Sequence, residues 1–371
     1  VAVILADIGL FPSLADRLQQ GFLEFLVLGR AMAHPDGFVA DPAFVIDGTA
    51  ALDPDALVYD GNSQGAILGG GLAAFGVDFT RVSLGVPGMN YSTLLNRSTD
   101  WEGVYGELLY AFYPSKAEQQ VVFNLIQMLW DRGEANGVAG HVTTDPLPDT
   151  PVKQVLMQAA FGDHQVSNLS AEVMARTMHA SRIVGDLPDC RHWAVDQYWG
   201  FSINDPTRPP AAVLAYYDSG TPTPPNGNVS PAGLGDDPHG DPRKDPVANA
   251  QKVTFFETGL VAEPHDGHAT TEWWPTRAGT FTDAVLAQVD DDSCLDFAAA
   301  PVGAGGPTSP ASSIGAPVAS PTAPPAALPA TGSDRPLLAI GFTSMALAVI
   351  GLRLRRRHVG LTASRSGAID G

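Results

Sequence analysis

A short turn at residues 59–65, Tyr-Asp-Gly-Asn-Ser-Gln-Gly, constrains the fold of this chain more than any other feature. Its centre, residues 61–65, fits the pattern G-x-S-x-G, in which a serine occupies a sharp turn between a strand and a helix. The run 56–59 is apolar and suits a buried strand, and the run 66–74 is small and apolar, as suits a helix packed on a sheet. The motif predicts a mostly parallel α/β sheet that presents Ser63 as a nucleophile. The alternative is an ordinary glycine-rich turn.

Steric crowding explains why this motif has glycine on both sides of the serine. The turn forces Ser63 into a strained backbone conformation, and side chains at Gly61 and Gly65 would collide across it. A serine hydroxyl is a poor nucleophile at neutral pH, so it needs a histidine to take its proton. A buried carboxylate must in turn orient that histidine. The rest of the chain should therefore supply an acid and a base.

Two further stretches extend the pattern. Residues 81–88 read as the next parallel strand, and residues 153–166 read as a strand that ends in Gly162 and Asp163. With the chain order Ser, Asp, His, these motifs resemble the α/β-hydrolase superfamily over about residues 1–260. The segment also resembles a group of uncharacterised extracellular bacterial hydrolases, which implies no particular substrate. The resemblance makes Asp163 the acid, whereas Gly-Asp on its own is also a common turn or helix-capping pair.

The base is chosen among nine histidines. The family that the chain resembles places its histidine after the last sheet strand, which we expect at 211–217. His239 follows that strand directly and is our first choice. His268 is the alternative, because a histidine after Asp-Gly also resembles the family pattern, and His265 ranks third. Each of these could instead be a plain surface histidine.

A helix is predicted directly after His239, at about 245–258. Asp245 suits its N-cap, Pro246 suits its first position, and Gly259 suits its stop.

The backbone N–H of Gln64, directly after the serine, is the expected first donor of an oxyanion hole. The second donor normally comes from a loop after an early strand, and we expect that loop to be missing, with the first strands of the sheet, from an N-terminally truncated chain. Residues 14–34 then read as an amphipathic helix. Its predicted inward positions are Leu14, Leu18, Phe22, Phe25, Leu26 and Leu28.

Residues 90–151 are expected to form an insertion between two sheet strands. The segment is rich in aromatic residues and includes a helix-like run at 123–130. Apolar positions at helical spacing usually indicate core packing. In the family that the chain resembles, however, insertions here roof the active site as a lid, which implies an apolar or aromatic substrate.

The C-terminal part carries a second motif of the pattern L-P-x-T-G. It comprises Leu328, Pro329, Ala330, Thr331 and Gly332. An apolar run at 337–352 and a basic run at 353–358 follow it, and the three parts together resemble a Gram-positive cell-wall sorting signal. The resemblance implies that a sortase cuts after Thr331 and joins it to peptidoglycan. The protein would then be extracellular and wall-anchored, and held in the membrane only transiently through 337–352. The alternative is an ordinary C-terminal transmembrane anchor.

Composition agrees with this placement. Residues 300–327 are uncharged and rich in Pro, Ala, Ser, Gly and Thr, which predicts a disordered stalk. The predicted organisation is a catalytic domain over 1–299, the stalk, and the sorting signal over 328–371. A net charge of −19 and a pI of about 4.6 argue against a nucleic-acid partner.

The two cysteines, Cys190 and Cys294, are compatible with one extracellular disulfide or with two unpaired thiols. We find no zinc spacing, phosphate-binding loop or dinucleotide fingerprint, so no metal or cofactor is predicted. The acidic run 290–292 is read as a solvated face rather than a calcium site.

Two classes of function remain. The first is a wall-anchored serine hydrolase that cleaves a small-molecule or lipid ester, with peptidase or acyltransferase activity as lesser variants. The second is a non-catalytic surface display or adhesion protein built on a degenerate hydrolase fold. Intact turns at Ser63 and Asp163 favour the first.

Overall fold

The computed structural model describes residues 2–183, 187, 191–192, 196, 198–262 and 349–351. Its centre is a seven-stranded sheet of order β7-β6-β8-β5-β4-β3-β9, in which six strands are parallel and β9 is antiparallel. The strands are β3 (Val58–Asn62), β4 (Arg81–Gly85), β5 (Gln154–Ala160), β6 (Ser181–Arg182), β7 (Ser202–Ile203), β8 (Ala212–Tyr217) and β9 (Val349–Gly351). A separate hairpin joins β1 (Val45–Ile46) to β2 (Thr49–Ala50). The predicted mostly parallel α/β architecture is therefore present.

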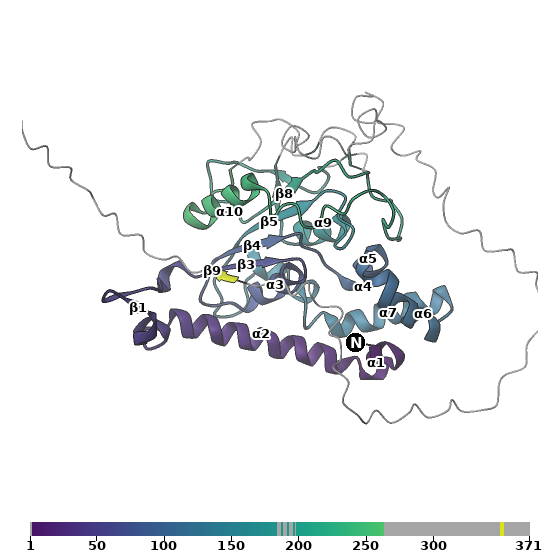
Figure 1. Cartoon of the computed structure of the whole chain (residues 1–371), viewed down its shortest axis with the longest axis horizontal. Coiled ribbons are helices and arrows are strands. Elements are labelled where there is room, and N and C mark those ends of the chain that lie inside the picture. Colours follow the sequence, from purple (N-terminus) through teal and green to yellow (C-terminus); the bar gives the residue numbers. More distant parts are fainter. Residues whose placement is uncertain are drawn as a thin grey trace, which may run out of the picture.

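Helices flank this sheet on both faces (Figure 1). They are α1 (Ala2–Ala6), α2 (Pro12–Ala33), α3 (Gln64–Phe75), α4 (Tyr91–Leu94), α5 (Thr99–Trp101), α6 (Glu107–Phe112), α7 (Lys116–Trp130), α8 (Gly140–Thr143), α9 (Asn168–Thr177) and α10 (Pro246–Thr258). The strands predicted at 56–59, 81–88, 153–160 and 211–217 are β3, β4, β5 and β8. The short strands β6 and β7 were not predicted.

The alternation of side chains along β8 shows how the two faces are covered. Leu214 and Tyr216 belong to one core, with residues of α3 and α9, while Val213 and Ala215 belong to another, with Phe255 of α10. All six β8 residues are buried, because helices cover the sheet on both sides. The sheet is thus an interior layer, and its strand ends are where polar groups can gather.

Helix α2 fits the predicted amphipathic segment except at one position. Phe22 is buried against the main core, and Phe25 and Leu26 pack beside it. Leu28, which we expected to point inward, is 42% exposed. The buried neighbour is Gly29, and one residue along a helix is a rotation of about 100°, so Leu28 turns toward solvent.

Helix α10 begins and ends where its capping residues predict. The side chain of Asp245 accepts a hydrogen bond from the backbone N–H of Val247 at 2.7 Å, and Pro246 is the first helical residue. Gly259 ends the helix with φ 76°, a left-handed conformation that favours glycine.

The segment between β4 and β5, which we predicted as an insertion at 90–151, forms helices α4 to α8. Helices α4 and α5 lie beyond the ends of the parallel strands in Figure 1. Their side chains and those of α7 share a second core with α1, which contains Leu5, Leu94, Trp101 and Phe123. This cluster also includes Ile67 of α3, and Val142 of α8 belongs to the core under the sheet, so the insertion packs against the sheet domain.

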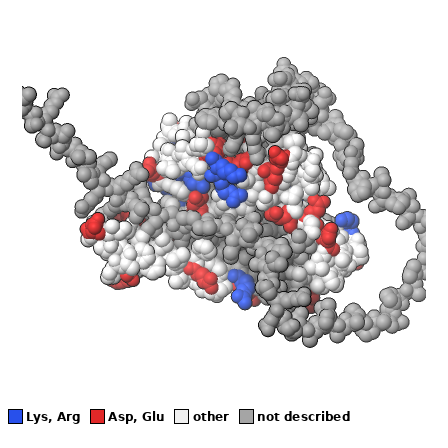
Figure 2. Space-filling model, in the orientation of Figure 1, with Lys and Arg blue, Asp and Glu red and all other residues white. Residues whose placement is uncertain are grey.

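The predicted apolar segment 337–352 is described only at 349–351, which form β9, and the predicted stalk 300–327 lies outside the described residues. Among the helices that the structure describes, none is both long and apolar enough to cross a membrane. Acidic side chains are spread in several groups over the face shown in Figure 2, so the charge of −19 forms no single patch there.

Candidate active site

Ser63 lies on the turn between β3 and α3. Its backbone has φ 57° and ψ −124°, a conformation that non-glycine residues rarely adopt. Its N–H donates to the carbonyl oxygen of Gly85 at the end of β4, at 2.8 Å. A Cβ on Gly61 would collide with the backbone carbonyl of Gly65. The turn therefore has the strained serine that the sequence motif predicts, and the steric need for glycine is shown at Gly61.

Asp163 follows β5, the next strand but one along the sheet. Gly162 turns the chain with φ 82°, and Asp163 is then held at 2% exposure. Its Oδ1 accepts hydrogen bonds from the backbone N–H groups of Gln165 at 2.8 Å and Val166 at 2.9 Å. Because these donors come from the following turn, they stabilise the carboxylate and fix its direction.

His239 joins the serine to the aspartate. Its Nε2 lies 2.9 Å from Oγ of Ser63, and its Nδ1 lies 2.9 Å from Oδ2 and 3.0 Å from Oδ1 of Asp163. The three residues come from the ends of β3 and β5 and from the segment after β8. Since the carboxyl ends of parallel strands meet at one edge of a sheet, the topology brings them together. All three side chains are buried.

The hydrogen bonds of this site define its proton positions. The ionised carboxylate of Asp163 can only accept, so Nδ1 of His239 carries the proton and donates it. Nε2 is then the acceptor for the hydroxyl of Ser63. Such an imidazole can take the proton of the serine when Oγ attacks.

Charges around His239 set its pKa. Burial lowers the pKa, but the charge and the hydrogen bond of Asp163 outweigh burial, so the pKa of His239 is raised above 6.5. The nearby charge of Arg243 lowers this pKa, and the charge of Asp237 raises it. The carboxyl of Asp100 is close enough to interact with His239, and burial raises its own pKa.

The other histidine candidates do not share this position. His265 and His268 lie outside the described residues. His192 pairs with Glu172, its Nε2 lying 2.6 Å from Oε1, on the core side of α9. His164 is buried directly after Asp163, with no hydrogen-bond partner for its Nε2 in the described part of the chain. Among the described histidines, His239 is the one in contact with both Ser63 and Asp163.

The backbone N–H that we predicted as an oxyanion donor lies in the first turn of α3. Gln64 is the first residue of this helix, and its backbone N–H has no acceptor among the residues that the structure describes. An uncapped N–H at a helix N-terminus carries partial positive charge. It can therefore donate to an oxyanion that forms beside Oγ of Ser63. No second donor is identified within the described residues.

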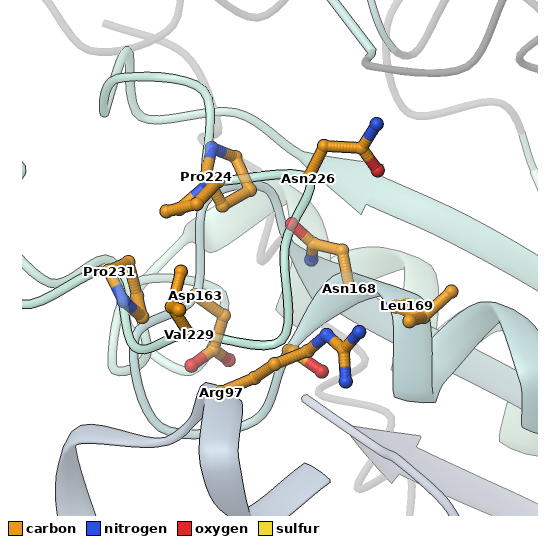
Figure 3. Close-up of a pocket in the computed structure, with 10 residues that line it drawn as sticks. Arg97, Asp163, Asn168, Leu169, Pro224, Asn226, Val229 and Pro231 are labelled. Carbon is orange, nitrogen blue, oxygen red and sulfur yellow. The ribbon is translucent and has the colours of Figure 1, made fainter. Parts of the chain in front are cut away.

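A small pocket lies beside Asp163 (Figure 3), and Ser63 is not among the residues that line it. Arg97, Asn168, Asn226 and Pro224 are among the residues that line it, and its volume is about 50 Å³. Ligand pockets usually have several hundred Å³. Because Ser63 does not line it, this pocket is not assigned to a substrate.

The segment 218–245, which carries His239, contains no helix or strand. A buried ion pair anchors its start, where Arg191 Nε lies 2.7 Å from Asp218 Oδ2 and Arg191 Nη2 lies 2.9 Å from Asp218 Oδ1. Asn228, further along, accepts from Arg97 at 2.7 Å. Sequence reasoning missed these anchors, because no local pattern links residues so far apart.

Several predicted features cannot be placed. Cys190 and Cys294, the acidic run 290–292 and the motif Leu328–Gly332 lie outside the described residues. In the described ranges, no group of three His, Cys, Asp or Glu side chains is arranged to hold a metal ion. Comparison of the chain with protein-family models, with curated proteins and with solved structures finds no match. The α/β fold is therefore stated from the sheet itself, and membership of a hydrolase family stays a prediction.

Proposed function

We propose that this protein is a serine hydrolase that cleaves a carboxylic ester through an acyl-enzyme intermediate. One observation carries the proposal: Oγ of Ser63 lies 2.9 Å from Nε2 of His239, whose Nδ1 lies 2.9 Å from Asp163. A nucleophile, a base and an orienting acid in this order form the general arrangement for acyl transfer. The parallel sheet with a serine turn after β3 supports a likeness to α/β-hydrolases.

Acylation would begin when Oγ of Ser63 attacks the ester carbonyl and its proton passes to Nε2 of His239. The negative charge that develops on the carbonyl oxygen would be stabilised by the N–H of Gln64. Asp163 stabilises the imidazolium that forms without taking its proton. His239 then donates the proton to the leaving oxygen, so the alcohol departs and the acyl group stays on Ser63.

Deacylation would use the same groups in reverse. A water molecule gives a proton to Nε2 of His239 as its oxygen attacks the acyl carbonyl. When the tetrahedral intermediate collapses, the bond to Oγ breaks and the imidazolium returns its proton to Ser63. The acid product leaves, and the site regains the hydrogen bonds seen in the structure.

A fluorophosphonate probe on the full-length chain tests this function. We expect labelling of the wild type and none of Ser63→Ala, because the probe reacts with an activated serine hydroxyl. Ser83→Ala is the matched control, since Ser83 is buried in β4 and its hydroxyl has no described hydrogen-bond partner. Absence of wild-type labelling and of p-nitrophenyl ester cleavage would support the display or adhesion alternative.

We also propose that the protein is anchored to a Gram-positive cell wall. The sequence Leu-Pro-Ala-Thr-Gly at 328–332, with its apolar and basic runs, supports this placement. In a Gram-positive host we expect the chain to be released from the wall by a muramidase, and Thr331→Ala to stay in the membrane fraction. Release of both forms by detergent alone would indicate an ordinary membrane anchor instead.

A further inference from the structure

Asp237 lies two residues before His239, and its carboxylate joins two segments that are far apart in the sequence. Oδ1 accepts from the backbone N–H of His239 at 3.0 Å and from that of His164 at 3.2 Å. Oδ2 accepts from the side-chain amide of Gln165 at 2.7 Å. His164 and Gln165 directly follow Asp163, so these bonds run beside the contact between Asp163 and His239.

His239 depends on such contacts because its own segment, 218–245, has no regular structure. The ion pair of Asp218 with Arg191 fixes the start of that segment, close to the end of β8. Asp245 fixes its end by capping α10. Between these points, Asp237 is the side chain that ties the turn of His239 to the loop of Asp163. We propose that Asp237 is a positioning residue, which holds the imidazole of His239 in line between Ser63 and Asp163.

This inference deepens the proposed hydrolase function and depends on it for its kinetic test. Asp237 does not contact the hydroxyl of Ser63, so it would act through His239 alone. A merely local role is an alternative, because the bond from Asp237 to the N–H of His239 is also an ordinary Asx turn. The bonds to His164 and Gln165 go beyond such a turn, since they cross to the loop that carries the acid.

Asp237 has two separable effects on His239. Its hydrogen bonds fix the turn, and its negative charge raises the pKa of the imidazole. The other charged groups that face His239 are Asp163, Asp100 and Arg243. Asp237→Asn keeps an oxygen for both backbone N–H groups and removes the charge, and the amide of Gln165 can rotate to accept from the new NH₂ group. Asp237→Ala removes both effects.

Steady-state kinetics on p-nitrophenyl esters should separate these effects. We expect Asp237→Ala to lower kcat about tenfold to hundredfold, because a misplacement of roughly 1 Å can cost two orders of magnitude. KM should change by less than about twofold, since the hydrogen bonds of Asp237 go to His239, His164 and Gln165 and not to Ser63. In Asp237→Asn, kcat at high pH should return to within about threefold of wild type. The fall of kcat at acidic pH should occur at a lower pH in this variant than in the wild type, because loss of a nearby negative charge lowers the pKa of His239.

Asp236 provides the matched control. It is exposed, and its carboxylate makes no hydrogen bond or ion pair within the described residues. Asp236→Ala and Asp236→Asn should therefore keep the wild-type kcat and pH profile. Wild-type kcat in a folded Asp237→Ala, or equal losses in Asp237→Asn and Asp237→Ala, would overturn the positioning role. Should Asp237→Ala fail to fold, Asp237→Asn decides: near-wild-type kcat at high pH with the acidic fall shifted to lower pH supports the proposal, and a large loss of kcat at every pH overturns it.

A second measurement separates this inference from the hydrolase proposal. The Nδ1–H proton of His239, bonded to Asp163, should give a downfield NMR resonance that disappears in His239→Ala. We expect the resonance to persist in Asp237→Asn and to weaken or vanish in Asp237→Ala. This pattern in a protein without esterase activity would sustain the positioning role and refute the hydrolase. An unchanged resonance in Asp237→Ala would refute the positioning role whatever the activity.

Discussion

Replacing Asp163 with asparagine should reverse the proton pattern of His239 while leaving its position unchanged. Oδ1 of Asp163 accepts from the backbone N–H groups of Gln165 and Val166, at 2.8 and 2.9 Å. The amide oxygen of asparagine must keep that place, because an NH₂ group there would face two donors. The NH₂ group is then left opposite Nδ1 of His239, where Oδ2 stood at 2.9 Å. Nδ1 then faces an NH₂ donor at 2.9 Å and the amide oxygen at 3.0 Å. Because an Nδ1–H group would be opposed by the NH₂ group, the tautomer with its proton on Nε2 is favoured.

An Nε2–H group donates to the hydroxyl of Ser63 and can no longer accept its proton. A change of tautomer of this kind reduces kcat by about four orders of magnitude. The loss corresponds to about 5 kcal/mol in the activation free energy. The variant should stay folded, since both backbone hydrogen bonds remain and a buried charge is removed.

We would measure kcat on p-nitrophenyl esters, the rate of fluorophosphonate labelling and the melting temperature. Asp236→Asn makes the same chemical change at an exposed neighbouring loop position, so it should keep wild-type values. If Asp163→Asn remains folded and retains kcat within about tenfold of wild type, the reasoning about the tautomer is refuted. The orienting acid would then have to be another residue.

Three further predictions concern pH and packing. Because the pKa of His239 is raised, kcat/KM should fall as the pH drops through a value above 6.5, and a midpoint below 6.5 would contradict this. Gly61→Ala should lower the free energy of unfolding by about 1–3 kcal/mol in urea titrations, whereas Gly21→Ala, with open space around it, should not. Burial raises the pKa of Glu134 to about 7, so the folded state holds a proton that the unfolded chain loses near pH 4.5. The free energy of unfolding should therefore fall as the pH rises from about 4.5 to about 7, and Glu134→Gln should lack this pH dependence.

Features encoded by neighbouring residues could be predicted from the sequence. The serine turn follows from the sequence around Gly61, where a Cβ would collide, and α10 follows from Asp245, Pro246 and Gly259. The parallel strands β3, β4, β5 and β8 follow from short apolar runs, because strands buried on both faces are apolar throughout. In these cases the local sequence contains the physical cause.

Features that depend on distant contacts could not be predicted. His239 meets Ser63 across 176 residues, and the sequence left His268 and His265 as alternatives, because the path of segment 218–245 is set by tertiary contacts. Strands β6 and β7 have two residues each, too few to show a period. Leu28 was misplaced because a wide apolar stripe on a helix does not reveal which edge meets solvent.

The local structures that carry Ser63 and His239 are supported very unequally. Ser63 stands between a strand paired with β4 and a helix packed in the core, but His239 is carried by a stretch without ladder hydrogen bonds. Segments with few backbone hydrogen bonds unfold locally at a lower free-energy cost than the rest of a domain. Mild heating should therefore separate His239 from Ser63 before the sheet unfolds. The proposed esterase activity should then disappear reversibly at temperatures where circular dichroism still reports intact secondary structure.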